Sequence, residues 1–200
     1  MTGRVRTAIL LSGRGSNMQA LVAAARRPDF PAEIALVLSD RSQAPGLEAA
    51  RQAGLSAEAI DYRGFSGKPA FEAELDARLR AAGIELVCLA GFMRILSASF
   101  VERWEGRILN IHPSLLPDLR GLNTHERALA EGRAEHGCTV HYVSAELDAG
   151  PIIVAARVPV LPGDDSETLA ARVLVQEHRI YPRALKSAAV ALRAGGAGAG

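Results

Sequence analysis

Asn110 and His112 are the most chemically suggestive pair of residues in this sequence. They end an apolar segment that begins near Gly106, and Pro113 follows, which indicates a short buried strand that stops at the proline. Side chains alternate between the faces of a strand, so Asn110 and His112 are expected on the same side. The amide can hydrogen-bond a carbonyl oxygen, and the imidazole can give or take a proton near neutral pH. The alternative is an Asn in a turn and a His bonded to backbone.

The turn Ser12-Gly13-Arg14-Gly15-Ser16-Asn17 is a second candidate site, because it joins an apolar segment at 7–11 to a helical pattern at 18–25. A strand, turn and helix in this order offer free N–H groups and a positive helix end to an anion. Ser16 with Gln19 forms a capping-box pattern. Met18 stands where a dinucleotide fingerprint has its third glycine, so a terminal phosphate monoester is the expected ligand. A plain tight turn is the alternative.

The segment Gly91-Phe92-Met93-Arg94-Ile95-Leu96 follows the all-apolar run at 86–90. At the end of a strand, these side chains could form a flat apolar slot with a cationic rim. Phe92 and Met93 could equally face the core.

Two acidic residues also need explanation. Asp148 lies in the turn 146–151, where a carboxylate is usually solvated unless the turn returns to the carboxyl edge of the sheet. Glu177 falls on the apolar stripe of the last predicted helix, and an acid there needs a partner or a ligand.

The elements that must position these residues alternate between strand and helix patterns. Strands are expected at 7–11, 34–39, 57–61, 86–90, 106–112, 137–143 and 152–160, and helices at 18–25, 46–53, 69–82, 123–131 and 166–181, with a short helical piece to Leu192. Asn123 with Glu126 marks the start of the fourth of these helices. The pattern predicts an α/β fold with an open, mostly parallel, Rossmann-like sheet of about seven strands and helices on both faces. Such sheets bind ligands at the carboxyl ends of their strands, where Asn110 and His112 are expected.

The 200-residue composition fits one domain at 1–193 followed by a disordered Gly/Ala tail at 194–200. The formal net charge of +1 gives no bulk electrostatic reason to bind nucleic acid or a membrane. Cys88 and Cys138 lie in apolar segments and are expected as free buried thiols. No apolar run suits a signal peptide or a membrane span, so the sequence predicts a cytoplasmic protein.

Asn110-Ile111-His112-Pro113-Ser114-Leu115-Leu116-Pro117 resembles the signature of the folate-dependent formyltransferase family, and most closely its glycinamide ribonucleotide formyltransferases. The likeness extends from about Thr7 to Pro182. In it the turn at 12–17 resembles a loop for the ribonucleotide phosphate, and 89–96 resembles the segment that holds the pterin-like ring of folate. The turn at 147–151 resembles the segment that carries a catalytic aspartate, and 176–178 the place where a glutamate contacts the ribonucleotide.

This resemblance implies a transferase of purine biosynthesis and one-carbon metabolism. It would move the formyl group of 10-formyltetrahydrofolate, a co-substrate, to the amine of 5′-phosphoribosylglycinamide, without a metal or a tightly bound cofactor. The implied catalytic residues are Asn110, His112 and Asp148, with Asp148 favouring the imidazolium form of His112. The implied ribonucleotide-binding residues are Gly13, Arg14, Gly15, Ser16, Asn17 and Glu177, and the implied folate-binding residues are Lys68, Met93, Arg94, Ile95, Leu96 and Asn110. The expected partners are these two small molecules, and the chain is expected to be a monomer or homodimer.

Four positions depart from the pattern expected of that family. Lys68 stands where an arginine often meets the glutamate tail of folate, which keeps the charge and loses the bidentate geometry. Asn123 replaces a histidine, Asp118 replaces a neutral or basic residue, and Asp40 replaces an asparagine. These changes bear on the affinity for the folate tail and on the loop after Pro117.

Three other functions fit parts of the pattern. A formyltetrahydrofolate hydrolase would use water as the nucleophile, and such enzymes resemble this domain with a regulatory domain in front. A methionyl-tRNA formyltransferase would carry a further C-terminal domain and a more basic surface. A non-catalytic nucleotide-binding module would use the turn at 12–17 but leave Asn110, His112 and Asp148 without a role.

Overall fold

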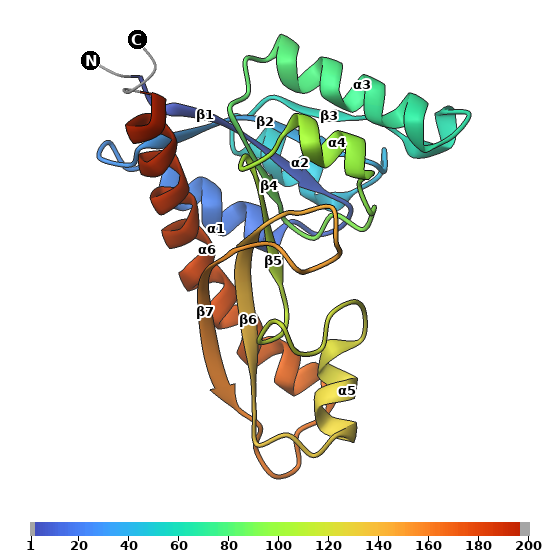
Figure 1. Ribbon diagram of the computed structural model, residues 1–200, viewed down its shortest axis with the longest axis vertical. Coiled ribbons are helices and arrows are strands. Elements are labelled where there is room, and N and C mark those ends of the chain that lie inside the picture. Colours follow the sequence, from blue (N-terminus) through green and yellow to red (C-terminus); the bar gives the residue numbers. More distant parts are fainter. Residues whose placement is uncertain (1–2, 197–200) are drawn as a thin grey trace.

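The computed structural model describes residues 3–196, whose strands form one sheet in the order β3-β2-β1-β4-β5-β6-β7 (Figure 1). Neighbouring strands from β3 to β5 run parallel, whereas β6 pairs antiparallel with both β5 and β7. The expected open, mostly parallel sheet of seven strands is therefore confirmed, with the chain reversal placed between β6 and β7. The strands are β1 (Val5–Leu11), β2 (Ala32–Ser39), β3 (Ala57–Ala59), β4 (Leu86–Leu89), β5 (Ile108–His112), β6 (Glu135–Tyr142) and β7 (Ile152–Pro159).

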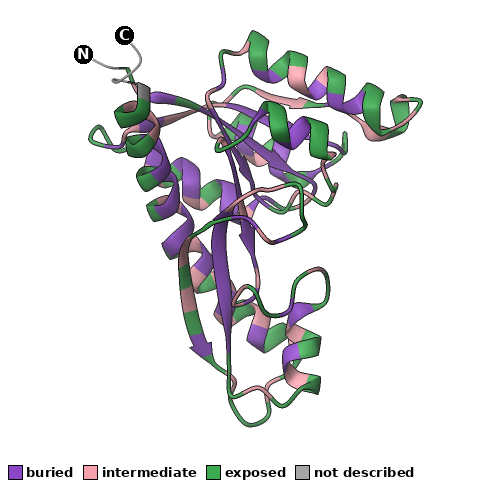
Figure 2. Cartoon of the chain, viewed as in Figure 1, coloured by how far each residue is buried: buried purple, intermediate pink, exposed green. Residues whose placement is uncertain are grey.

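Helices cover both faces of the sheet because its central strands are apolar on both sides. In β1, Ile9 and Leu11 pack into one core with α1 and α6, while Ala8 and Leu10 pack into the other with α3 and α4. Figure 2 shows the buried strands between these helices. The helices are α1 (Ser16–Ala25), α2 (Pro45–Gln52), α3 (Lys68–Ala81), α4 (Ala98–Arg103), α5 (Thr124–Ala130) and α6 (Ser166–Gly196), with a short 3-10 turn at Tyr62–Gly64.

Helix α6 corrects the expectation that the last helix ends before Pro182. It runs without interruption to Gly196 and carries Pro182 in its interior. A proline inside a helix removes one backbone hydrogen bond, but α6 packs against α1, β6 and β7, and tertiary packing outweighs that loss. The expected disorder at 194–196 is also wrong, and the rest of that tail, residues 197–200, lies outside the described residues.

Two predicted helix caps have a different physical basis. α1 begins after Gly15 and α5 after Asn123, but both residues adopt the left-handed conformation, with φ of 77° and 56°, and neither helix has a side-chain cap. The cap expected from Ser16 is therefore wrong, because Ser16 lies inside α1. Asn123 is the N-cap residue of α5 as predicted, but its side chain accepts no capping hydrogen bond. Both helix starts lie within two residues of the predictions. α4 was not predicted, and Ser97 caps it by accepting a hydrogen bond from Phe100 N.

Other features agree with the sequence. Cys88 and Cys138 are free, buried thiols, and burial raises the pKa of each to about 12. No helix in residues 3–196 combines the length and the apolar character needed to cross a membrane. The Leu116-Pro117 peptide bond, in the loop between β5 and α5, is cis.

Candidate active site

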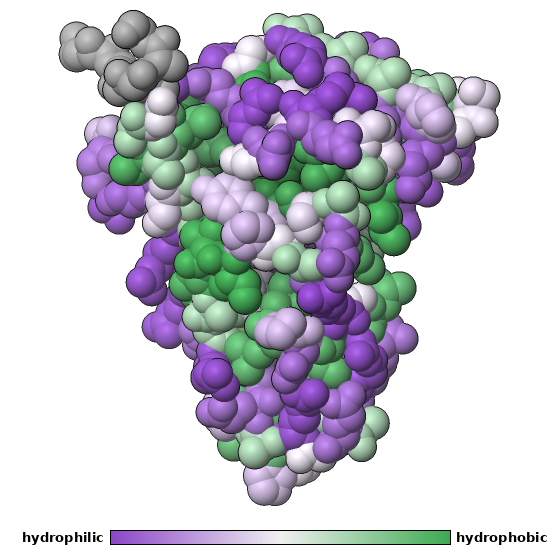
Figure 3. Space-filling model, viewed as in Figure 1, coloured by the Kyte–Doolittle hydropathy of each residue, from purple (hydrophilic) through white to green (hydrophobic). Residues whose placement is uncertain are grey.

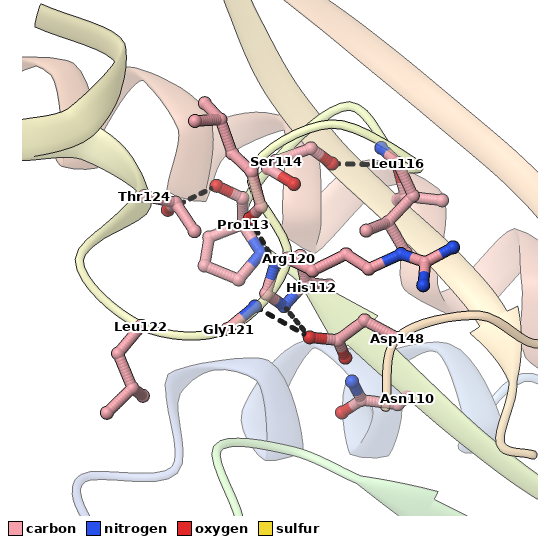
Figure 4. Close-up of polar contacts among 12 residues, drawn as sticks. Asn110, His112, Pro113, Ser114, Leu116, Arg120, Gly121, Leu122, Thr124 and Asp148 are labelled. Atoms are coloured by element: carbon pink, nitrogen blue, oxygen red, sulfur yellow. Dashed lines mark hydrogen bonds and ion pairs between the residues drawn. The ribbon is translucent and has the colours of Figure 1, made fainter. Parts of the chain in front are cut away.

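His112 lies at the end of β5, where it contacts the turn that carries Asp148. Its Nδ1 is 3.4 Å from Asp148 Oδ2, and both side chains are almost fully buried (Figure 4). Its Nε2 is 3.0 Å from the carbonyl oxygen of Leu119. Both ring nitrogens thus face acceptors, and an imidazolium would donate to both at once. The β6–β7 turn therefore returns to this edge of the sheet, which the sequence alone did not decide.

Asp148 is fixed by backbone geometry as well as by His112. The Gly121 N–H donates to Asp148 Oδ2 at 3.0 Å. Asp148 and Leu119 both adopt the left-handed conformation, with φ of 51° and 53°. Such strained residues cost roughly 1–3 kcal/mol each and persist only where surrounding contacts hold them, which is common at active sites.

Asn110 lies in the same site, and its side chain contacts His141. The two residues face each other across the antiparallel pair β5–β6, and Asn110 Nδ2 is 3.3 Å from His141 Nε2. His141 Nε2 is also 3.8 Å from Asp148 Oδ1. The structure thus brings together all three predicted catalytic residues and adds His141 to them. Figure 4 shows Asn110 beside Asp148, with His112 on the other side of that carboxylate.

Side-chain hydrogen bonds stabilise the loop that follows His112. Thr124 Oγ1 donates to the carbonyl of Pro113, and Thr139 Oγ1 donates to the carbonyl of Ser114. Thr139 Oγ1 also accepts from Leu116 N at 3.1 Å. Leu122 is 77% exposed at the end of the loop and points away from the cluster (Figure 4). Near the end of the loop, Arg127 Nη1 donates to the carbonyl of Arg120 at 2.7 Å, so the loop is anchored at both ends.

The predicted ribonucleotide residues gather at the start of α1. Asn17 Nδ2 donates to Glu177 Oε2 at 2.6 Å, which gives the acid on the apolar stripe of α6 its partner. Burial raises the pKa of Glu177, and the hydrogen bond from Asn17 opposes that shift. Asn17 Oδ1 is buried without a partner among the described residues. Gly13 and Arg14 lie in the turn just before α1. The first N–H groups of α1 have no partners within the helix.

The predicted folate segment contains two exposed apolar residues. Met93 and Ile95 are each 63% exposed, whereas Phe92 and Leu96 are half-buried against the core. Phe92 therefore packs against the core, as one interpretation expected, whereas Met93 does not. In Figure 3, hydrophobic residues lie among hydrophilic ones across the middle of the drawn face.

Asp40 ties the two predicted binding segments together. Its Oδ1 accepts from Ser12 Oγ at 2.5 Å, and its Oδ2 lies 2.9 Å from Arg94 Nε. Ser12 Oγ in turn accepts from Met93 N at 2.9 Å, and the Arg94 guanidinium lies over the ring of Tyr62. Asp40 therefore fixes Arg94 at the rim of a pocket of about 510 Å³ that is also lined by Arg14, Arg41 and Arg63.

Lys68 is exposed at the first turn of α3. It lines a pocket of about 400 Å³ with Glu72, Ser97 and Arg103. Glu72 accepts from Ser97 N at 2.7 Å, so the start of α3 is fixed beside the end of the segment 93–96. Lys68 is thus beside the predicted folate segment and apart from the cluster around His112.

Comparisons with known proteins found similar sequences and structures. A family model described as formyl transferase matches residues 5–185. The chain is 47% identical over 174 residues to phosphoribosylglycinamide formyltransferase of Escherichia coli strain K12, covering 87% of this chain and 82% of that protein. It is 50% identical over 184 residues to trifunctional purine biosynthetic protein adenosine-3 of Drosophila pseudoobscura pseudoobscura, covering 91% of this chain. It spans only 14% of the length of that trifunctional relative.

Solved structures show the same fold. The phosphoribosylglycinamide formyltransferase of Brucella melitensis has a TM-score of 0.89 and 52% identity, with 93% of this chain and 96% of that chain covered. Glycinamide ribonucleotide transformylase 1 of Symbiobacterium toebii has a TM-score of 0.92 and 46% identity, with 96% of this chain and 90% of that one covered.

Proposed function

Because this chain belongs to the formyl transferase family, we propose that it transfers the formyl group of 10-formyltetrahydrofolate to the amine of 5′-phosphoribosylglycinamide. The products are the N-formyl ribonucleotide and tetrahydrofolate. The observation that carries this proposal is the cluster of Asn110, His112 and Asp148, assembled from strand β5 and the β6–β7 turn at one edge of the sheet.

The cluster suits an acyl transfer through a tetrahedral intermediate. The amine forms a bond to the formyl carbon, the bond from that carbon to the folate nitrogen breaks, and one proton moves from the amine to that nitrogen. Charge develops on the formyl oxygen, and Asn110 Nδ2 donates a hydrogen bond to it. His112 stabilises the same oxygen or transfers a proton, and Asp148 orients the ring.

The Leu119 carbonyl occupies one hydrogen-bonding position of His112. For Nε2 to donate to substrate, that contact must break, so the loop 113–123 shifts or the ring rotates when substrates bind. A crystal structure with both substrates or their analogues should show the His112–Leu119 contact broken, and a retained contact would contradict this step.

The two substrates occupy opposite sides of the cluster. The phosphate binds the N–H groups of Gly15, Ser16 and Asn17, and Glu177 contacts the ribonucleotide. The folate ring lies against the segment 93–96 and Asn110, and its tail reaches Lys68 or Arg94. No resident cofactor or metal enters this scheme, because both reacting groups belong to the substrates.

The proposal also includes the domain organisation, the compartment and the oligomeric state of the enzyme. One continuous sheet includes strands from both halves of the chain, which supports a single catalytic domain at 1–193. Two free buried thiols suit a reducing compartment, and we propose a cytoplasmic enzyme acting as monomer or homodimer.

The test is an absorbance assay of folate deformylation with and without 5′-phosphoribosylglycinamide. We expect turnover only when the ribonucleotide is present, and a loss of about 10²-fold or more in kcat for His112→Ala. Arg157→Ala, on the exposed outer strand β7, is the control and should leave turnover unchanged. Folate breakdown without the ribonucleotide would indicate a hydrolase, and no turnover by the folded protein would contradict the proposal.

A further inference from the structure

His141 is a buried titratable residue of the site that has no role in the formyl transfer proposed above. It is 1% exposed, lies in β6 and pairs directly across from Asn110 in β5. Directly opposed residues of an antiparallel pair place their side chains on the same face. The backbone register thus sets the Asn110 amide against the His141 ring.

The two hydrogen bonds of His141 determine where its proton lies. Nδ1 is 2.9 Å from the carbonyl oxygen of Tyr142, which can only accept, so Nδ1 carries the proton. In the neutral ring, Nε2 then presents a lone pair to Asn110. An amide nitrogen only donates, so the side chain of Asn110 must turn its NH2 group toward His141.

We propose that His141 is a positioning residue that holds the Asn110 amide in the one orientation able to stabilise the formyl oxygen. One N–H of Asn110 is used by His141, and the second is left for the developing oxyanion. In the flipped amide, Oδ1 would take the place of the NH2 group. One of its lone pairs would face the Nε2 lone pair of His141, and the other would face the formyl oxygen in place of an N–H donor. This inference rests on the proposed formyl transfer for its catalytic meaning, but the orientation itself does not.

The charges around His141 agree with a neutral ring. Burial lowers the pKa of His141, and so does the nearby His112. The bond to Tyr142 O and the carboxylate of Asp148 act in the opposite direction. Asp148 Oδ1 is 3.8 Å from Nε2, beyond a hydrogen bond, so Asn110 is the direct partner of that nitrogen.

Two matched substitutions test the role. His141→Gln places a carboxamide oxygen near the position of Nε2 and keeps an acceptor for Asn110. His141→Phe keeps a planar ring of similar size and removes the acceptor. We expect His141→Gln to retain most of the wild-type kcat, and His141→Phe to lose about tenfold or more in kcat with little change in either KM.

A double-mutant cycle separates positioning from general support. In an Asn110→Ala background, which should itself lose about 10²- to 10³-fold in kcat, His141→Phe should have almost no further effect. An equal loss from His141→Phe in both backgrounds would overturn the proposal. Circular dichroism and thermal melts check that each variant folds, and His141→Leu replaces the Phe variant if that one does not.

The tautomer can be measured without turnover. In the ¹⁵N-labelled wild-type protein without substrates, NMR of the imidazole nitrogens should find the His141 proton on Nδ1 and none on Nε2. A proton on Nε2 near neutral pH would overturn the proposal. If the wild-type enzyme shows no formyl transfer, the proposed function fails, while this spectrum still decides the orientation of Asn110.

Discussion

At the scale of residues, the site is built from buried polar groups that each depend on one or two partners. His112, His141 and Asp148 form one such set, and Asn17 with Glu177 forms another. Burial of polar groups is costly unless they are hydrogen-bonded, so each of these groups depends on its partner to remain buried. Glu177 is the clearest case, because the residue is only 8% exposed and its carboxylate accepts from the amide of Asn17.

Glu177→Gln should make the protein more stable and a poorer enzyme. The folded-state pKa of Glu177 is raised by burial, so the carboxylate form costs stability as pH rises above its ordinary value of 4.5. A neutral Gln removes that cost, and its NH2 can donate to the unpartnered Asn17 Oδ1. We expect the Tm at neutral pH to rise by a few degrees. The KM for the ribonucleotide should increase about tenfold or more, because a charged hydrogen bond to substrate is lost.

The measurements are calorimetry and steady-state kinetics on the same preparation. Glu167→Gln, which changes an exposed acid at the start of α6, is the control and should alter neither quantity. A variant with unchanged Tm and unchanged KM would show that Glu177 neither bears a desolvation cost nor contacts the ribonucleotide.

At the scale of elements, the catalytic groups are positioned by strand β5, the β6–β7 turn and the loop after His112. The β6–β7 turn brings Asp148 back over β5, and Gly150 allows the chain to pass close to β6. A Cβ on Gly150 would lie 1.8 Å from the Tyr142 carbonyl oxygen, the same oxygen that accepts from His141. The loop after His112 is held at its base by β6 and α5.

Gly150→Ala should displace the turn and lower activity more than substrate binding. The added methyl group cannot fit against Tyr142 O, so the backbone must move and take Asp148 with it. We expect kcat to fall by about 10²-fold, as for misplacement of a catalytic group by about 1 Å. Gly64→Ala is the control, since Gly64 does not adopt the left-handed conformation and a Cβ there meets no atom within 4 Å. Equal kcat for wild type and Gly150→Ala would contradict this account.

The packing of α5 against β6 should make stability depend on pH. His125 Nδ1 is 3.1 Å from His136 Nε2, and burial lowers the pKa of His136 to about 4. The folded state binds protons less readily than the unfolded state. The contribution of neutral His136 to the free energy of unfolding is therefore fully present above the ordinary His pKa of 6.5, and it is lost as pH falls toward about 4.

His136→Gln should remove much of this pH dependence. We expect the urea midpoint of the wild-type protein to decrease between pH 6.5 and 4 more steeply than that of the variant. Carboxylates titrate in both proteins, so the difference between the two slopes is the quantity to compare. Parallel slopes would show that His136 is not the group responsible.

At the scale of the whole molecule, α6 joins the two halves of the sheet. Along its 31 residues it packs against α1, β6 and β7 (Figure 1). Tyr181 is fully buried near its middle, and its hydroxyl lies 3.0 Å from Leu89 O and 3.2 Å from Leu109 O. These carbonyls end β4 and precede Asn110 in β5, so one hydroxyl links the helix to both central strands.

Tyr181→Phe should reduce stability with little effect on kcat. The substitution keeps the ring and leaves two buried carbonyls without this donor, which should cost about 1–3 kcal/mol. For a chain of this size that loss lowers the Tm by about 2–4 °C per kcal/mol. Thermal melts and kcat measured together provide the check, and an unchanged Tm would contradict the role given to the hydroxyl.

The sequence alone determined the order of elements and the candidate residues. Apolar periodicity separated strands from helices because buried faces repeat every two or about 3.6 residues. The proline after His112 marked the end of β5, and the apolar stripe of α6 singled out Glu177 as an acid in need of a partner. Helix ends were less predictable: Ser16 and Asn123 match capping patterns, yet the preceding residue or the cap itself adopts the left-handed conformation instead.

Only the tertiary structure decided which of these residues meet. The register between β5 and β6 sets His141 against Asn110, and the β6–β7 turn carries Asp148 to His112. Neither contact has a local signal, because residues 31 and 36 positions apart become neighbours only when the sheet forms. The continuation of α6 through Pro182 likewise depends on packing against α1 and the sheet, which outweighs the intrinsic preference of proline. Local preferences therefore defined the parts, and long-range packing determined the geometry of the site.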